Sequence, residues 1–341
     1  MSRQQLVETA AAMVASGKGI LAADESTGTL QSRFDGIGIQ ATETSRREYR
    51  DLLFTTPGLE AFISGVILYD ETLRTNSLSG VPFPDLIAER GILPGAKVDT
   101  GLTGLAGFPG EQITEGLDGL KERVEAYRDL GARFAKWRAV VTPGEGIPTR
   151  TCIQANAHAL ARYAAICQEA GVVPIVEPEI LMEGSHTIEA CEAATQSTMD
   201  AVFSELLAHR VLLEGIVVKP SMVLSGASCP VQAGVEEVAE TTIRCFRRTI
   251  PAAVPGVAFL SGGQSPELST AHLNAMNAMG DHPWEVSFSY GRALQDPARA
   301  VWKGAAVNRE KAQEVFHHRA KCNGAARFGK YTQEMESFQI G

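Results

Sequence analysis

Several short apolar segments of this chain end in charged residues of the kinds that carry out carbonyl chemistry. In EGIVVKP (214–220), Lys219 follows three β-branched residues, which favour a strand buried on both faces. Pro220 cannot donate to a sheet, so we expect the strand to stop there and to leave Lys219 at its end. Desolvation at such a position favours the neutral, nucleophilic form of an amine. For this segment alone, a lysine whose ammonium reaches solvent is the more common outcome.

The other apolar segments carry ionisable or hydroxyl residues in equivalent places: Asp24, Asp70, Lys97 with Asp99, Lys136 with Arg138, Glu177 with Glu179, Ser261, and Ser287 with Ser289. Residues i and i+2 of a strand share a face, so each doublet can point to one side. Because an unpaired buried ion costs several kcal/mol, such charges are expected to neutralise one another around a single cavity.

Each of these residues also has a purely structural interpretation. Lys136 and Glu177 could form a simple ion pair, and Asp99 and Glu179 could cap loops or hold lysines. For Asp70, a helix cap or loop carboxylate is the favoured interpretation. The convergence of three lysines, an arginine and at least two carboxylates at equivalent strand ends nevertheless favours an active site.

Two glycine-rich turns, LSGGQS (260–265) and SYGRAL (289–294), follow the last two apolar segments. Backbone N–H groups near a helix N-terminus suit an oxyanion, and Arg292 stands beside the second turn. Loops after the seventh and eighth strands are the usual phosphate site of a (β/α)8 barrel. The pair of turns therefore predicts a phosphorylated ligand.

The elements that must position these residues alternate regularly. The apolar segments are eight candidate strands: 19–24, 64–70, 95–99, 133–138, 173–179, 214–220, 257–263 and 285–291. Amphipathic helical patterns lie between them, for example over 118–131, 153–171 and 235–250. Eight such units predict an α/β fold, a (β/α)8 TIM barrel, as a single domain over residues 1–341. A helix over residues 1–15 precedes the barrel, and the tail after about 305 is helical and then irregular.

Composition narrows the class of protein. Of the 341 residues, 44% are hydrophobic and 21% charged, and the net charge of −9 argues against a nucleic-acid partner. Only 6% are aromatic and no apolar run reaches 18 residues, so no membrane association is expected. The six scattered cysteines are typical of reduced thiols in a cytoplasmic protein.

Signals for a bound cofactor are missing from the sequence. The seven histidines show no HxH or HExxH spacing, and no glycine-rich nucleotide motif opens a helix. We therefore expect neither a metal at the active site nor any other cofactor. A lysine that forms an iminium with a carbonyl would then supply the electron sink.

The motifs together resemble a known family. KGILAADESTGTL, GVILYDETL, KVDTGL, FAKWR, VPIVEPEIL, VVKPSMV, FLSGGQS and SFSYGRAL, between about residues 17 and 331, look like the class I, Schiff-base-forming fructose-1,6-bisphosphate aldolases. The resemblance implies a metal-independent glycolytic and gluconeogenic lyase. It would cleave fructose 1,6-bisphosphate reversibly to dihydroxyacetone phosphate and glyceraldehyde 3-phosphate.

The resemblance also implies a role for each site residue. Lys219 would form the Schiff base, Glu177 would move protons, Asp24 would take the C4 hydroxyl proton, and Lys136 and Glu179 would set the charge of the site. One phosphate would bind the residues of the glycine-rich turns: Ser261, Gly262, Gly263, Ser289, Gly291 and Arg292. The other would bind near Ser26, Arg33 and Lys97, with Arg138 close by. Family members are commonly homotetramers.

This chain departs from the family pattern at two places. Animal members have a longer tail whose final tyrosine assists enamine protonation, whereas here the sequence ends in MESFQIG and its last tyrosine is Tyr331. We expect Glu177 or water to carry more of that step. Residue 32 is Ser where many relatives have Lys, so one phosphate contact is expected to be weaker.

Two other functions fit the same residues less closely. One is a Schiff-base aldolase for another sugar phosphate, such as sedoheptulose bisphosphate or fructose 1-phosphate. The other is a catalytically silent barrel that binds a protein partner. The intact set of Lys219, Glu177 and Asp24 argues against the silent barrel.

Overall fold

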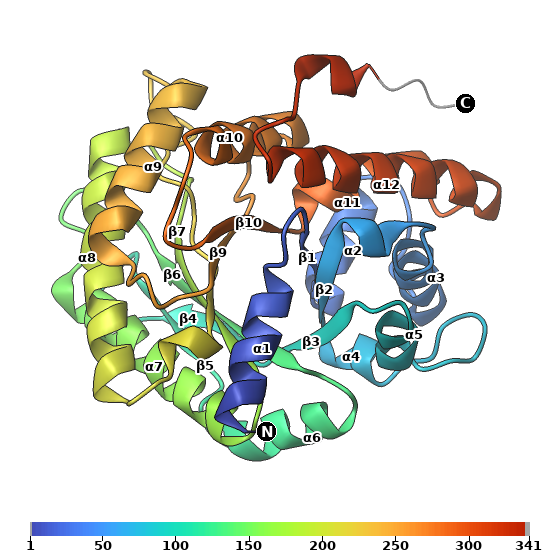
Figure 1. Ribbon diagram of the computed structural model, residues 1–341, viewed down its shortest axis with the longest axis horizontal. Coiled ribbons are helices and arrows are strands. Elements are labelled where there is room, and N and C mark those ends of the chain that lie inside the picture. The colour runs from blue at the N-terminus through green and yellow to red at the C-terminus, as the bar shows by residue number, and fades with distance from the viewer. Residues whose placement is uncertain (1, 338–341) are drawn as a thin grey trace.

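The computed structural model describes residues 2–337, and its centre is a closed parallel barrel of eight strands in the order β1-β10-β9-β8-β7-β6-β3-β2 (Figure 1). The strands are β1 (Gly19–Ala23), β2 (Ile63–Leu68), β3 (Leu93–Lys97), β6 (Phe134–Val141), β7 (Val173–Ile180), β8 (Val217–Val218), β9 (Gly256–Phe259) and β10 (Glu285–Tyr290). Each overlaps one of the eight candidate segments, although β6 continues beyond residue 138 and β3 begins before residue 95. The (β/α)8 prediction is therefore confirmed.

Helices surround the barrel (Figure 1). They are α1 (Arg3–Met13), α2 (Thr27–Asp35), α3 (Glu43–Phe54), α4 (Asp70–Leu73), α5 (Phe83–Glu89), α6 (Leu120–Asp129), α7 (Arg150–Glu169), α8 (Ile188–Ala208), α9 (Val235–Thr249), α10 (Pro266–Ala278), α11 (Arg292–Trp302) and α12 (Arg309–Ala326). Several begin after a Ser or Thr whose hydroxyl accepts a first-turn N–H, as Thr149 does for α7. No helix within residues 2–337 is long and apolar enough to span a membrane.

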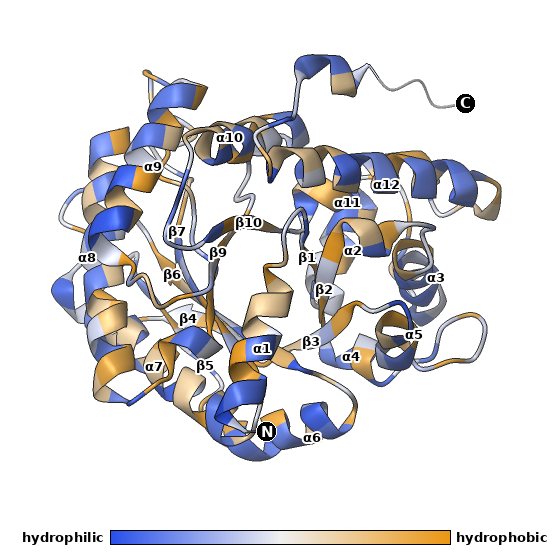
Figure 2. Cartoon of the chain, in the orientation of Figure 1, coloured by the Kyte–Doolittle hydropathy of each residue, from blue (hydrophilic) through white to orange (hydrophobic). Residues whose placement is uncertain are grey.

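The helix α7 shows how the apolar pattern places a helix on the barrel. Its predicted stripe is buried: Ile153, Ala157, Leu160, Ala164 and Cys167. The helix ends before Gly171, whose φ of +78° suits a residue without a Cβ. The helices are hydrophilic on much of their outward surface (Figure 2), as expected for elements that bury only one face.

A two-stranded hairpin was missed by the sequence analysis. The strands β4 (Gly101–Gly104) and β5 (Gln112–Glu115) pair antiparallel in the connection between β3 and α6. Both are short and only partly buried, so they lack the continuous apolar run that identified the barrel strands. The hairpin follows the carboxyl end of β3 and so lies at the end of the barrel that carries the site.

The helix α1 closes the opposite, amino-terminal end of the barrel (Figure 1). Its buried residues Leu6, Ala10 and Met13 join one hydrophobic cluster with residues of the barrel interior. The interior members are Ile20, Ala22, Ile67, Phe134, Val173, Ile175, Val217 and Ala258. Burial of this apolar surface contributes stability in proportion to its area, at about 25 cal/mol per Å². The leading helix is therefore part of the barrel core.

The guanidinium of Arg327 fixes the end of the last long helix to the same end of the barrel. It donates to the carbonyl oxygens of Val14 at 3.0 Å and Lys18 at 2.9 Å, and it pairs with Glu285 at 2.7 Å. Carbonyl groups at the end of α1 and just before β1 thereby find a charged donor.

Phe134 fills the amino-terminal part of the barrel interior, because Gly95, its neighbour on β3, has no side chain. Gly95 pairs with Phe134 across the two strands, and a Cβ at residue 95 would overlap the phenyl ring. The phenyl ring of Phe134 occupies the space that a side chain at residue 95 would take, so this layer of the barrel interior is close-packed.

We expect Gly95→Ala to lower the free energy of unfolding by about 1–3 kcal/mol, because overpacking a closed core forces side chains or backbone to shift. Chemical denaturation followed by circular dichroism measures the effect. Gly104→Ala in the hairpin is the matched control, since no atom lies within 4 Å of its added Cβ. Equal losses in the two variants would contradict the packing argument.

Candidate active site

A cavity of about 420 Å³ opens at the carboxyl ends of the barrel strands. Fourteen of the fifteen site residues named from the sequence line it: Asp24, Ser26, Arg33, Lys97, Lys136, Arg138, Glu177, Glu179, Lys219, Ser261, Gly262, Ser289, Gly291 and Arg292. The exception is Gly263, which does not line the cavity. A Cβ on it would still lie 3.8 Å from Arg292 Nη1, so it is adjacent to the site.

Lys219 lies at the bottom of the cavity, directly after β8. Its backbone N–H donates to the carbonyl oxygen of Val176 at 2.8 Å, which continues the parallel pairing with β7 beyond the end of the strand. Its side chain is 5% exposed, and Nζ lies 3.1 Å from Oε1 of Glu177. The amine therefore has a carboxylate within proton-transfer distance and little contact with water.

Lys136 on β6 joins two carboxylates. Its Nζ lies 2.8 Å from Oδ2 of Asp24 and 3.2 Å from Oε2 of Glu177. The second contact lacks the geometry of a hydrogen bond, so it is an ion pair only. Since Glu177 also contacts Lys219, the four side chains form one chain of alternating charge, Asp24–Lys136–Glu177–Lys219. Lys136 and Glu177 are thus more than an isolated structural pair.

The charges of this network set the protonation of its members. Burial alone would raise the pKa of Asp24, but the ammonium groups of Lys136 and Lys219 lower it to about 2. The pKa of Glu177 is lowered in the same way, against its own burial. Burial would lower the pKa of Lys136, but Asp24 and Glu177 raise it above its ordinary value. At neutral pH, both carboxylates are ionised and Lys136 is a cation.

Two further ion pairs line the cavity. Lys97 Nζ lies 2.6 Å from Oδ1 of Asp99, and the guanidinium of Arg138 pairs with Glu179. Asp99 therefore holds a lysine, which was one of the interpretations open from the sequence, whereas Glu179 holds an arginine and not a lysine. Arg138 keeps a side-chain exposure of 36%, so part of its guanidinium remains open to the cavity.

Arg292 has no carboxylate within ion-pair distance in the described part of the chain. It begins α11 after Gly291, and its guanidinium donates to the carbonyl oxygen of Gly262. Burial lowers the pKa of Arg292, and the nearby charge of Arg33 lowers it further. Two arginines that repel each other in a half-buried position favour an anion between or beside them.

The hydroxyl of Ser289 points to the same conclusion. Ser289 is 1% exposed and lines the cavity, yet its Oγ has no hydrogen-bond partner among residues 2–337. A buried hydroxyl without a partner is costly unless a ligand completes it.

The side-chain amide of Gln264 stabilises the turn that carries Ser261. Gln264 donates to the carbonyl oxygen of Ser261 at 3.2 Å, and its own Oε1 lies 2.6 Å from Nδ1 of His272. Burial lowers the pKa of His272 to about 4, so the ring is neutral and Nδ1–H is the donor to the amide. This arrangement fixes the turn without placing a charge beneath the anion site.

Other residues singled out in the sequence lie elsewhere. Asp70 is the first residue of α4 and pairs with Arg74 at 2.8 Å, so it is neither the helix cap, which is Tyr69, nor the loop carboxylate that was expected. Tyr331 donates its hydroxyl to Glu336 at 2.8 Å and does not line the cavity. Of the C-terminal MESFQIG segment, residues 338–341 lie outside the described residues. Ser32 donates to the carbonyl oxygen of Gly28 at 3.2 Å.

Several cavity residues were not predicted from the sequence, and Glu25 is the most informative of them. Its carboxylate is held by Arg50 at 2.9 Å and by Gln295 at 2.9 Å, so it fixes the connection between β1 and α2. The acidic doublet in AADES was a visible signal, but only Asp24 was assigned. The others are Ala22, Thr29, Asp99, Gly101, Leu102 and Leu260. Asp99 had been noted without being assigned, and Gly101 and Leu102 stood in the motif KVDTGL without being given a role.

Comparisons with known proteins agree with this arrangement. A chain of Xanthomonas campestris pv. campestris named "Probable fructose-bisphosphate aldolase class 1" is 58% identical over 97% of this chain and 99% of its own length. Fructose-bisphosphate aldolase 1 of Toxoplasma gondii is 55% identical over 96% of this chain and 91% of its own.

A solved structure gives the same result in three dimensions. It is a fructose-bisphosphate aldolase from Plasmodium falciparum in complex with TRAP and a small-molecule inhibitor, and it superposes with a TM-score of 0.95 at 49% identity. The match covers 96% of this chain and 95% of that one. The family model described as fructose-bisphosphate aldolase class-I matches residues 5–340. This chain therefore belongs to the class-I fructose-bisphosphate aldolase family, as the sequence motifs predicted.

Proposed function

We propose that this enzyme cleaves fructose 1,6-bisphosphate reversibly to dihydroxyacetone phosphate and glyceraldehyde 3-phosphate through a Schiff base on Lys219, without a metal ion. The observation that carries the proposal is the contact of 3.1 Å between Lys219 Nζ and Glu177 at the bottom of the cavity. A buried amine with a carboxylate beside it has both the nucleophile and the proton carrier that imine formation needs.

The first steps use Lys219 and Glu177. The neutral amine of Lys219 adds to the C2 ketone, and the resulting carbinolamine loses water to give an iminium. Glu177 carries the protons in these steps: it takes one from the Lys219 ammonium to free the amine and a second from the nitrogen after the addition, and it delivers both to the ketone oxygen, which leaves as water. Lys136 stays protonated beside Glu177, which keeps a fixed positive charge at the site during the transfers.

The bond-breaking step uses Asp24. As an ionised carboxylate it accepts the proton of the C4 hydroxyl while the C3–C4 bond breaks. The electron pair of that bond passes into the iminium, which becomes an enamine, and glyceraldehyde 3-phosphate leaves. Protonation of the enamine and hydrolysis release dihydroxyacetone phosphate and restore Lys219.

The phosphates are assigned to the remaining cations and hydroxyls. Arg292 and the unpartnered hydroxyl of Ser289 favour one phosphate on the two glycine-rich turns. Ser26, Arg33 and Lys97 would receive the other, with Arg138 near the lysines. Assembly as a homotetramer and a cytoplasmic location stay predictions from the resemblance.

Borohydride trapping tests the nucleophile. With dihydroxyacetone phosphate and borohydride in EDTA, we expect a reduced adduct on Lys219 in peptide mass mapping and full cleavage activity before reduction. Lys219→Arg keeps the positive charge beside Glu177 but should give no adduct, because a guanidinium is not a nucleophile at neutral pH. An adduct on Lys97 or Lys136, or activity lost to EDTA, would refute the mechanism.

The ammonium of Lys136, which Asp24 and Glu177 share, leads to a prediction about the pH dependence of the reaction. Lys136→Met removes the charge that lowers the pKa of Asp24 and Glu177, so burial should raise both values. Carboxylates with raised pKa values protonate at higher pH. The acidic limb of the residual kcat/KM profile should therefore move to higher pH than in the unmodified enzyme.

Lys97→Met is the control for that profile. Lys97 lowers the pKa of Asp24 less than Lys136 and Lys219 do, so its loss should move the acidic limb far less. An acidic limb that stays in place in Lys136→Met would show that these carboxylates do not limit the reaction.

The serine at position 32 favours testing a second substrate. Ser32 is bonded to its own helix, whereas a lysine there could reach a phosphate from α2. We expect Ser32→Lys to lower KM for fructose 1,6-bisphosphate and to increase its kcat/KM relative to fructose 1-phosphate. Ser32→Gln, of similar length without the charge, is the control. An unchanged KM in the lysine variant would exclude this position as a phosphate contact.

A further inference from the structure

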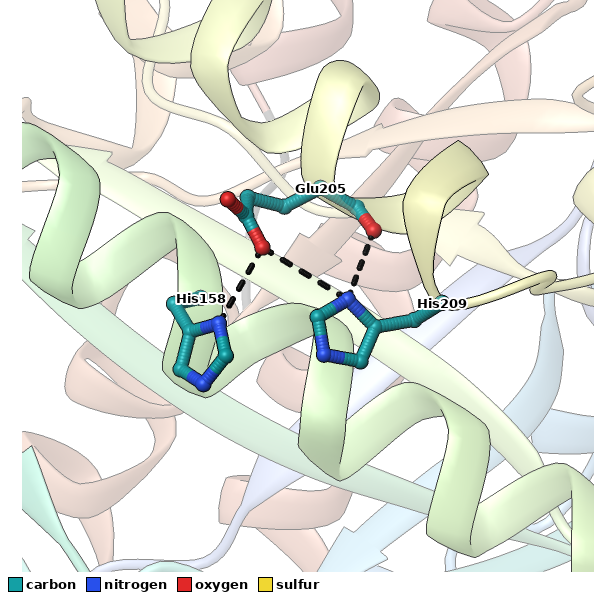
Figure 3. A group of neighbouring side chains, drawn as sticks. All are labelled: His158, Glu205 and His209. Atoms are coloured by element: carbon teal, nitrogen blue, oxygen red, sulfur yellow. Dashed lines mark hydrogen bonds and ion pairs between the residues drawn. The ribbon is translucent and has the colours of Figure 1, made fainter.

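Two histidines and a glutamate meet on the outer helices of the barrel (Figure 3). Glu205 lies in the last turn of α8 and His209 caps that helix, so their i, i+4 spacing places them on one face. His158 comes from α7, the helix that packs beside α8. None of the three lines the active-site cavity.

The three side chains converge on a single carboxylate oxygen. Oε2 of Glu205 lies 3.1 Å from Nδ1 of His158 and 3.5 Å from Nδ1 of His209. Bonds of about 2.0–2.2 Å at tetrahedral angles separate neighbouring Zn²⁺ ligands by about 3.4 Å. Both nitrogen–oxygen distances already match that spacing, and the three ligand atoms all lie within 4.8 Å of one another.

The proton positions show where a cation would fit. Nδ1 of His209 lies 2.9 Å from the carbonyl oxygen of Glu205, which can only accept, so this nitrogen carries the proton. Nδ1 of His158 likewise faces an acceptor, the carboxylate. Two N–H donors thus point toward one glutamate. A cation that takes the place of these protons, with each imidazole protonated on Nε2 instead, would be held by all three residues.

The donor set and its exposure select the kind of ion. Two imidazoles and a carboxylate are a recurrent ligand set for Zn²⁺, whereas Mg²⁺ and Ca²⁺ prefer oxygen ligands alone. The side chains of His158, Glu205 and His209 are 51%, 34% and 25% exposed, so an ion can enter from solvent and water can complete its coordination.

A second group, His318, Cys322 and Glu336, is a poorer candidate for a cation. Glu336 is already paired with the buried guanidinium of Arg319 at 2.5 Å and accepts the hydroxyl of Tyr331 at 2.8 Å. Cys322 is fully buried, and burial raises the pKa of its thiol to about 11, which disfavours the thiolate that a metal needs. A cation there would have to compete with an arginine.

We propose that His158, Glu205 and His209 form a surface Zn²⁺ site that joins α7 to α8. The proposal is independent of the aldolase reaction, because the site lies outside the cavity and supplies no group to it. Zn²⁺ bound here would act as a cross-link between consecutive barrel helices and would stabilise the folded state by mass action.

Calorimetric titration of the untagged, EDTA-treated and desalted full-length chain with Zn²⁺ alone tests the site. We expect one bound ion per chain and a rise in melting temperature on addition of Zn²⁺. Loss of even an outer partner of a metal ligand costs about 10- to 100-fold in affinity, so His158→Ala, Glu205→Gln and His209→Ala should each weaken binding at least that much. Each variant should keep its aldolase activity.

Two comparisons make the result decisive. His318→Ala should bind Zn²⁺ as the unmodified chain does; loss of binding in it would assign the ion to the other group and overturn the proposal. Measuring melting temperatures without Zn²⁺ separates the effect of the substitutions on the empty protein from the effect of the ion. Undiminished binding by His158→Ala/Glu205→Gln/His209→Ala, or no binding by the unmodified chain, would also refute the site.

Discussion

The active site depends on a buried ammonium that two carboxylates share. Lys136 lies between Asp24 and Glu177, and Glu177 extends the network to Lys219. Removing one member would leave a buried ion uncompensated, which costs several kcal/mol. The network also determines chemistry, since it keeps Asp24 and Glu177 ionised at neutral pH although both are buried. The same charges therefore hold the site together and prepare its proton acceptors.

The distribution of charge in the cavity explains how an acidic protein can bind a substrate with two phosphates. The chain has a net charge of −9, yet six cations and five carboxylates line the cavity. Most cations are already paired with a carboxylate there. Arg33 and Arg292 have no carboxylate partner within residues 2–337, and their mutual repulsion is relieved by an anion. Local arrangement, and not net charge, decides what this protein attracts.

The sequence was informative where strand periodicity and charge coincide. Doublets such as Lys136 with Arg138 and Glu177 with Glu179 could be placed on one face because side chains alternate along a strand. Their pairing between the neighbouring strands β6 and β7 could not be read from the sequence, because it depends on a register in which Arg138 lies opposite Glu177 although its guanidinium pairs with Glu179. The cluster of His158, Glu205 and His209 could not be predicted either, again because it depends on how two elements pack.

His158 and His209 stand on different helices, so the search for short ligand spacings could not find them. The hairpin β4–β5 was missed because its strands are too short and too exposed to carry a pattern. In each case, the missing information is the packing of one element on another.

The interior faces of the strands show how one barrel can hold both a stable core and a charged site. Along β7 the residues that share a face are Val173, Ile175, Glu177 and Glu179, and β6 passes from Phe134 to Lys136 in one step of two residues. The apolar layers pack on α1 and exclude water at the amino-terminal end of the barrel. The charged layer is therefore open to solvent only through the cavity. In that setting each charge acts more strongly on its neighbours than it would in water. The hydrophobic core beneath the site is therefore a condition for the chemistry above it, since the same lysines and carboxylates at a solvated strand end would be screened and would lose their mutual influence.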